Sequence, residues 1–90
     1  MAWKVEIDPE AEKELDRLDP QHAKRILRFL FKRIATNEDP KRFGDPLKRN
    51  FSCLWKYRVG DYRVVCDIQE QIFTVLVVMI DHRRKVYGGH

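Results

Sequence analysis

The stretch LWKYRVGDYRVV, residues 54–65, decides the fold, because two strand-like runs flank Gly60-Asp61. Gly60-Asp61 predicts a two-residue hairpin turn, since glycine at the first position adopts the positive φ that such turns require. With this turn, Arg58 lies opposite Arg63, and opposed residues of an antiparallel pair point to the same face. The hairpin is therefore expected to have a basic face with Lys56, Arg58 and Arg63, and an apolar face with Trp55, Tyr57, Val64 and Cys66.

The opposition of Arg58 and Arg63 needs a physical explanation. Like charges placed directly opposite each other destabilise a strand pair. An anion bound between the two guanidinium groups would remove that penalty, and this is the interpretation we favour. Two alternatives stay open: the arginines extend into water, or they pair with Asp67 or Asp81. A turn of another length would shift the register and weaken the argument.

Outward from the hairpin, the chain predicts three strands in a row and one at its start. The expected strands cover residues 51–59, 62–69 and 72–80, and a short alternating run covers residues 3–7. Residues 72–80 are apolar apart from Thr74, which predicts a central strand covered on both faces.

Two helices are predicted between the first strand and the other three. Asp8-Pro9 and Asp19-Pro20 each combine a capping residue with a proline suited to the first helical position. After Asp8-Pro9 the apolar residues recur every three or four positions as far as Leu18, and after Asp19-Pro20 they do so as far as Ile34. Two amphipathic helices joined this closely indicate a helical hairpin. Residues 36–50 predict a loop. The expected fold is a single α+β domain, residues 1–90: a short N-terminal strand, the helical hairpin, then a three-stranded antiparallel meander, with the helices packed on one side of the sheet.

The charge of the chain is unevenly distributed. The formal net charge is +4. Residues 1–45 hold ten Lys/Arg and ten Asp/Glu, whereas residues 46–90 hold eight Lys/Arg and four Asp/Glu. An excess confined to one half favours a polyanionic partner such as RNA, and a merely solubilising surface is the alternative. The basic residues of the second helix are expected to be a solvated face, with a second RNA-contacting surface as the less favoured option.

Other sequence features limit the class of protein. No 18-residue apolar run is present, so no membrane span is expected. The N-terminal residues lack signal-peptide features, so we expect a cytoplasmic protein. Cys53 and Cys66 lie in apolar strand-like runs and are expected to be buried free thiols.

The stretch DHRRKVY, residues 81–87, follows the last apolar strand and combines basic residues with a tyrosine. A solvated basic tail is one interpretation. The other is a site for RNA cleavage without a metal, which needs a base for the 2′-hydroxyl, cations for the phosphate, and an acid for the leaving oxygen. Arginine suits the phosphate clamp, and lysine, tyrosine or histidine can move protons when neighbouring charges tune the pKa. No metal-ligand spacing is present, so neither a metal nor another cofactor is expected.

At residues 54–65 and 82–87 the chain resembles the RelE/ParE toxin superfamily. The first stretch is similar to a basic strand that turns at glycine and continues through an aromatic-Arg-hydrophobic run. The second, HRRKVY, is similar to the HR-x-x-V-Y ending of the ribonuclease members. The resemblance extends over essentially the whole chain and implies a RelE-like fold.

The resemblance implies a function and a set of site residues. It implies a type II toxin that cuts mRNA in the ribosomal A site through the 2′-hydroxyl, with ribosome, 16S rRNA and mRNA as partners. A cognate antitoxin would inhibit it, and the complex would bind its own operator DNA through the antitoxin. The implied catalytic residues are Lys56, Arg63, Arg83, Tyr87 and His82. The expected RNA-binding residues are Arg58, Arg84, Lys85, Lys48 and Arg49.

The assignment of the proton-transfer roles stays open. Lys56 or Tyr87 would act as the base, and His82 or Arg83 as the acid. Leu54 stands where some members carry a further lysine, so the resemblance does not decide between them. Two other functions also stay open: inhibition of DNA gyrase, as in the ParE branch, and RNA binding without cleavage.

Overall fold

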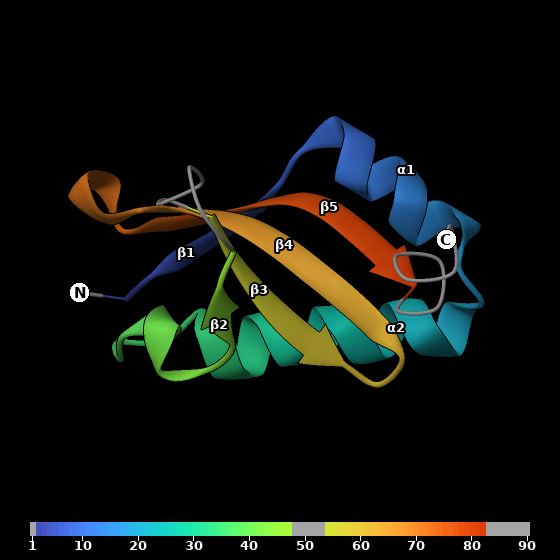
Figure 1. Cartoon of the computed structure of the whole chain (residues 1–90), viewed down its shortest axis with the longest axis horizontal. Coiled ribbons are helices and arrows are strands. Elements are labelled where there is room, and N and C mark those ends of the chain that lie inside the picture. The colour runs from blue at the N-terminus through green and yellow to red at the C-terminus, as the bar shows by residue number, and fades with distance from the viewer. Residues whose placement is uncertain (1, 48–53, 83–90) are drawn as a thin grey trace.

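The computed structural model describes residues 2–47 and 54–82, which build a five-stranded sheet with two helices against it (Figure 1). The strand order is β1-β5-β4-β3-β2, with β1 parallel to β5 and the other neighbours antiparallel. The strands are β1 (Lys4–Ile7), β2 (Asp45–Pro46), β3 (Leu54–Val59), β4 (Tyr62–Gln69) and β5 (Thr74–His82). The helices are α1 (Pro9–Arg17) and α2 (Pro20–Phe29), and α2 continues as a π-helical turn, Leu30–Ile34.

Both helices begin where the Asp-Pro pairs predict. The Asp8 carboxylate accepts a hydrogen bond from the Glu10 amide at 3.0 Å, and Asp19 accepts one from the Gln21 amide at 3.2 Å. Each cap satisfies an amide that the first helical turn would otherwise leave unpaired. Within the described part of the chain, neither helix has the length and apolarity needed to cross a bilayer.

The core lies between the helices and one face of the sheet. One cluster contains the buried side chains of both helices, of the π-helical turn and of three strands. This confirms that both helices pack on one side of the sheet. Its members are Ala11, Leu15, Ile26, Leu30, Ile34, Tyr57, Val59, Val64, Cys66, Ile68, Val75, Val77 and Ile80. The predicted apolar face of the hairpin is also confirmed, with Trp55 packed against the edge of this cluster.

The predicted hairpin register is confirmed. Val59 pairs with Tyr62 and Arg58 with Arg63, so Gly60-Asp61 forms the two-residue turn. Gly60 has a φ of 62°, a conformation that glycine adopts without steric cost. The Arg25 guanidinium of α2 lies 3.0 Å from where a Cβ at this position would stand. The absent side chain therefore lets the turn lie against α2.

The prediction for the last strand is wrong at two points. Residues Glu70–Ile72 form a 3-10 turn, Phe73 has a left-handed φ of 48°, and β5 begins only at Thr74 and continues to His82. Because residues 72–80 are almost uniformly apolar, the sequence does not indicate where the 3-10 turn ends and the strand begins. The strand is also not covered on both faces, because Met79 is 43% exposed on the side away from the helices.

The predicted loop contains an element that sequence reasoning missed. Pro40–Arg42 form a 3-10 turn, and β2 then pairs with Trp55 and Lys56 of β3. Gly44, with a φ of 73°, allows this pairing, because a side chain there would meet the Lys56 carbonyl oxygen and the Tyr57 ring. The start of the predicted 51–59 strand, including Cys53, lies outside the described residues.

Candidate functional site

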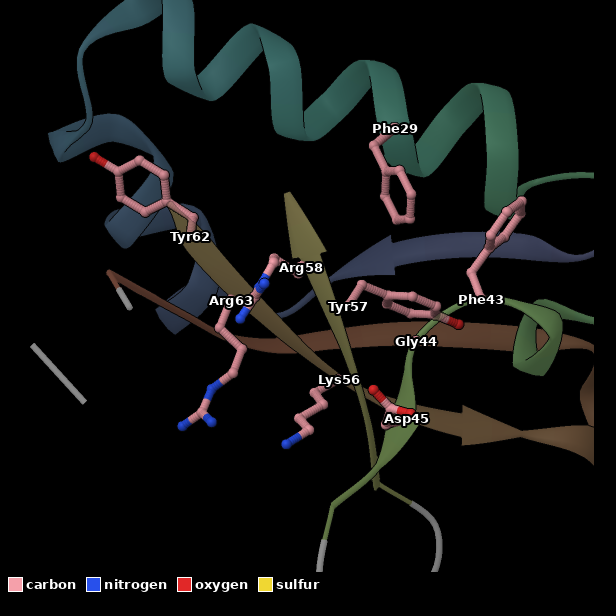
Figure 2. Close-up of a pocket in the computed structure, with 9 residues that line it drawn as sticks. All are labelled: Phe29, Phe43, Gly44, Asp45, Lys56, Tyr57, Arg58, Tyr62 and Arg63. Atoms are coloured by element: carbon pink, nitrogen blue, oxygen red, sulfur yellow. The ribbon is translucent and has the colours of Figure 1, made fainter. Parts of the chain in front are cut away.

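The register puts the basic residues of the hairpin on the face of the sheet away from the helices, with Arg58 at the strand end where this face meets α2. Figure 2 shows Lys56 and Arg63 pointing away from α2. Arg63 pairs with Arg58 on one side and with Asp81 of β5 on the other, so one row across three strands holds two guanidinium groups and one carboxylate. The register brings the two arginines together as predicted, and it also puts Asp81 beside Arg63, so both the phosphate site and the pairing with Asp81 stay open as explanations of the row.

A hollow of about 480 Å³ wraps the edge of β3 where β2 ends (Figure 2). Its two walls differ in chemistry. The basic wall consists of Lys56, Arg58 and Arg63, and the aromatic wall consists of Phe29, Phe43, Tyr57 and Tyr62. Gly44 and Asp45 complete the described lining. The hollow therefore offers both cations for phosphate and flat apolar rings beside them.

The aromatic wall is held by contacts between α2, the loop before β2 and β3. The Phe29 ring lies 5.5 Å from the Tyr57 ring and 6.1 Å from the Phe43 ring, between centroids. The buried Tyr57 hydroxyl donates to the Pro40 carbonyl at 2.8 Å, and the Trp55 indole donates to the Phe43 carbonyl at 2.6 Å. These bonds attach the loop to the sheet and set the shape of the hollow.

Two buried acids of the core, one of which also lines the hollow, are unsuited to proton transfer. Burial is the main cause that raises the pKa of the Tyr57 phenol, and Cys66 and Asp39 raise it further. Burial also raises the pKa of the free Cys66 thiol, with a smaller contribution from Asp67. Both groups stay protonated at neutral pH. Tyr57 therefore shapes the hollow without being available as a base.

The same two groups predict a loss of stability at alkaline pH. The unfolded chain releases their protons near the ordinary pKa values, about 9.0 for the thiol and 10.0 for the phenol, whereas the folded protein retains them. The free energy of unfolding should be highest below about pH 9. It should fall by about 1.4 kcal/mol per pH unit as the pH rises above the ordinary pKa of the thiol, and more steeply once it also exceeds that of the phenol. Urea unfolding between pH 7 and 10.5 measures this slope. Cys66→Ala should reduce it, and an equal slope in that variant would contradict the assignment.

The structure does not bring His82 together with Lys56 and Arg63. His82 pairs with Tyr62, and their ring centroids are 5.0 Å apart in an edge-on contact. The Tyr62 ring lies 5.3 Å from His22 of α2, so this group stands on the helix side of the sheet. Alternation along β4 puts Arg63 on the opposite side. The sequence did not predict this placement, because a bulge in β5 opposite Val65 and Cys66 reverses the alternation before residue 82.

Several predicted site residues lie outside the described residues. These are Arg83, Arg84, Lys85 and Tyr87 after β5, and Lys48 and Arg49 before β3. Of the predicted set, the structure thus positions Lys56, Arg58, Arg63 and His82, and it brings the first three together.

A second groove, of about 510 Å³, lies between α2 and the end of β3. Its charged lining residues in the described chain are all basic: Arg25, Arg28, Lys32, Arg33 and Arg58. The sequence predicts a solvated face for the helical members of this set. Their spacing of three to four residues could have indicated a shared surface. Arg58 and Phe29 line both cavities, so the two lie next to each other.

Comparison with known proteins decides the family. The profile of the family described as the ParE toxin of type II toxin-antitoxin system, parDE, matches residues 5–87. The chain belongs to the RelE/ParE toxin superfamily. Toxin RelE of Mycobacterium tuberculosis is 33% identical over 85 residues, covering 94% of this chain and 86% of that protein. Toxin RelG of the same organism is 29% identical over 87 residues, covering 97% and 98%.

Solved structures of RelE toxins share the fold. The toxin-antitoxin complex RelBE2 of Mycobacterium tuberculosis contains a chain with a TM-score of 0.82 and 28% identity, covering 92% of this chain and all of that one. A mutant of the E. coli toxin RelE in the free state has a TM-score of 0.73 at 20% identity, covering 98% and 93%. The chain is therefore a type II toxin with a RelE-like fold.

Proposed function

We propose that this toxin is a ribosome-dependent endoribonuclease that cleaves mRNA in the A site by metal-independent attack of the 2′-hydroxyl. The observation that carries the proposal is the joint placement of Lys56, Arg58 and Arg63 on the open face of the sheet, with the two arginines in one cross-strand row. Planar guanidinium groups suit a phosphate whose charge increases in the transition state.

Within this mechanism, Arg63 and Arg83 hold the scissile phosphate, and Lys56 or Tyr87 takes the proton of the 2′-hydroxyl. The leaving 5′-oxygen needs a proton from the other side of the phosphorus. Because His82 packs against Tyr62 on the helix side, we assign this step to Arg83 and give His82 a positioning role at the end of β5. Arg58, Lys48, Arg49, Arg84 and Lys85 bind the RNA strand.

We further propose that a cognate antitoxin inhibits the toxin and that the complex binds its operator DNA through the antitoxin. Two observations support a partner: the cationic hairpin face favours an acidic covering segment, and similar structures are described as toxin-antitoxin complexes. Those complexes are RelB or RelBE assemblies of the other proteins. The cytoplasm, where the ribosomes are, is the proposed location.

The test is cleavage of ribosome-bound mRNA by the purified toxin, with the cut positions mapped. We expect cuts at A-site codons, a 2′,3′-cyclic or 3′-phosphate product, and full activity in EDTA. A 2′-deoxy nucleotide at the cut position should abolish cleavage, because the nucleophile is missing. Arg83→Ala and Tyr87→Phe should each greatly reduce cleavage. Cleavage and growth arrest that persist in both variants would show that this assignment is wrong.

Inhibition of DNA gyrase is the second candidate, favoured by the match to the ParE family profile. It predicts loss of supercoiling activity in a purified gyrase assay and DNA damage on expression, with mRNA left intact. A toxin that inhibits gyrase and cuts no ribosome-bound mRNA would replace our proposal.

A further inference from the structure

The cavity at the β3 edge, called the edge hollow below, has features that phosphate chemistry does not use. Binding and cleaving a phosphate requires only its basic wall. The aromatic wall adds Phe29 and Phe43, both only partly buried, and the hollow holds about 480 Å³. An apolar surface that a protein leaves open beside a charged site commonly serves a ligand with an apolar part.

The aromatic wall has the chemistry of a base-stacking platform. The Arg42 guanidinium lies 4.4 Å from the centroid of the Phe43 ring, and the Phe29 ring meets Phe43 at an interplanar angle of 64°. The neighbouring loop is fixed to β3 through Trp55 and Tyr57, so the platform is preformed. Stacking of an unpaired base on such rings contributes binding energy whatever the base.

Asp45 provides the polar group that could distinguish one base from another. It is exposed at the rim of the edge hollow and pairs in register with Lys56. Neither side chain makes an ion pair or hydrogen bond with another residue in the ranges 2–47 and 54–82. A carboxylate beside a phosphate site weakens anion binding, so its presence favours a ligand that also carries hydrogen-bond donors. The exocyclic amines of adenine, cytosine and guanine are such donors, whereas uracil has no exocyclic amine and its ring N3–H lies between two carbonyl oxygens.

We infer that the edge hollow binds one unstacked base of the RNA strand, next to the phosphate held by Lys56 and Arg63. In this arrangement one of the two rings, Phe29 or Phe43, stacks on the base while the other meets its edge, because the rings lie at 64° to each other, and Asp45 accepts a hydrogen bond from its exocyclic amine. The inference rests on the proposed nuclease function and adds a specificity site to it. Uracil is disfavoured because its two carbonyl oxygens, one on each side of N3–H, approach the carboxylate.

The test measures binding separately from cleavage. Short RNA oligonucleotides with 2′-O-methyl groups cannot be cut, so their affinity for the purified toxin can be measured by calorimetry with each of the four bases at one position. We expect adenine, cytosine and guanine to bind about tenfold more tightly than uracil. Asp45→Asn should bring the four affinities within about twofold. Phe43→Leu, which retains apolar bulk, should weaken all four by about tenfold.

The matched control is Asp61→Asn, since Asp61 is an exposed carboxylate in the β3–β4 turn and does not line the edge hollow. It should retain the preference of the wild type. Equal binding of all four bases by the wild type would overturn the inference, as would a preference unaffected by Asp45→Asn. Cleavage of mRNA without base preference would leave the nuclease proposal standing and remove the base site. Selective binding of RNA without cleavage would leave the base site standing and remove the nuclease proposal.

Discussion

Arg63→Ala should lower the rate of cleavage of ribosome-bound mRNA by about 10²- to 10³-fold, because it removes a fixed donor to the phosphate as its negative charge increases. Single-turnover cleavage with saturating toxin measures this loss without interference from weaker binding. Arg63→Lys should restore only part of the rate, since lysine keeps the charge but not the planar pair of donors. Lys24→Ala is the control, because Lys24 is an exposed cation of α2 that lines neither cavity.

Lys56 gives this prediction a second, more discriminating part. If Lys56 is the base, both Lys56→Ala and Lys56→Arg should lose about 10²-fold or more of the rate, because a guanidinium is already protonated at neutral pH and cannot accept the 2′-hydroxyl proton. If Lys56 acts only through its charge, Lys56→Arg should retain most of the rate, and the role of base passes to Tyr87. Near-wild-type cleavage in Arg63→Ala and Lys56→Ala together would show that the open face of the hairpin is not the active site.

Tyr57→Ala should cause the largest loss of stability in the described chain, about 3–5 kcal/mol of the free energy of unfolding. Tyr57 is 1% exposed, packs against Phe29 and donates a hydrogen bond to the Pro40 carbonyl. A domain of this size has roughly 5–13 kcal/mol in total, so the variant should be close to unfolding at 37 °C. Urea unfolding at 25 °C followed by tryptophan fluorescence measures the difference.

Tyr57→Phe separates packing from hydrogen bonding. It keeps the ring and should cost about 1–2 kcal/mol, because the buried Pro40 carbonyl loses its donor. The matched control is Tyr62→Phe, since the Tyr62 hydroxyl makes no hydrogen bond to the described residues and its loss should cost under about 0.5 kcal/mol. Equal losses in the two phenylalanine variants would mean that the bond to Pro40 contributes nothing.

Local chemistry in the sequence determined the hairpin, both helix starts and the basic face. Gly60-Asp61 defines the register from the turn alone, and the register puts Arg58 opposite Arg63 whatever the rest of the chain does. Each Asp-Pro pair likewise needs only the next few residues to start a helix. These features depend on contacts between residues close in the chain, which is why the sequence predicts them.

The tertiary structure alone decided where the edge hollow lies and which residues line it. Phe29 and Phe43 come from α2 and from the loop before β2, and neither is near residues 54–65 in the sequence. β2 forms only because Gly44 permits a close approach to β3, and its two residues carry no strand pattern of their own. His82 lies on the helix side because the bulge of β5 opposite Val65 and Cys66 reverses the alternation of side chains in the last part of the strand. Contacts between distant segments set all three outcomes, and a local pattern contains no information about them.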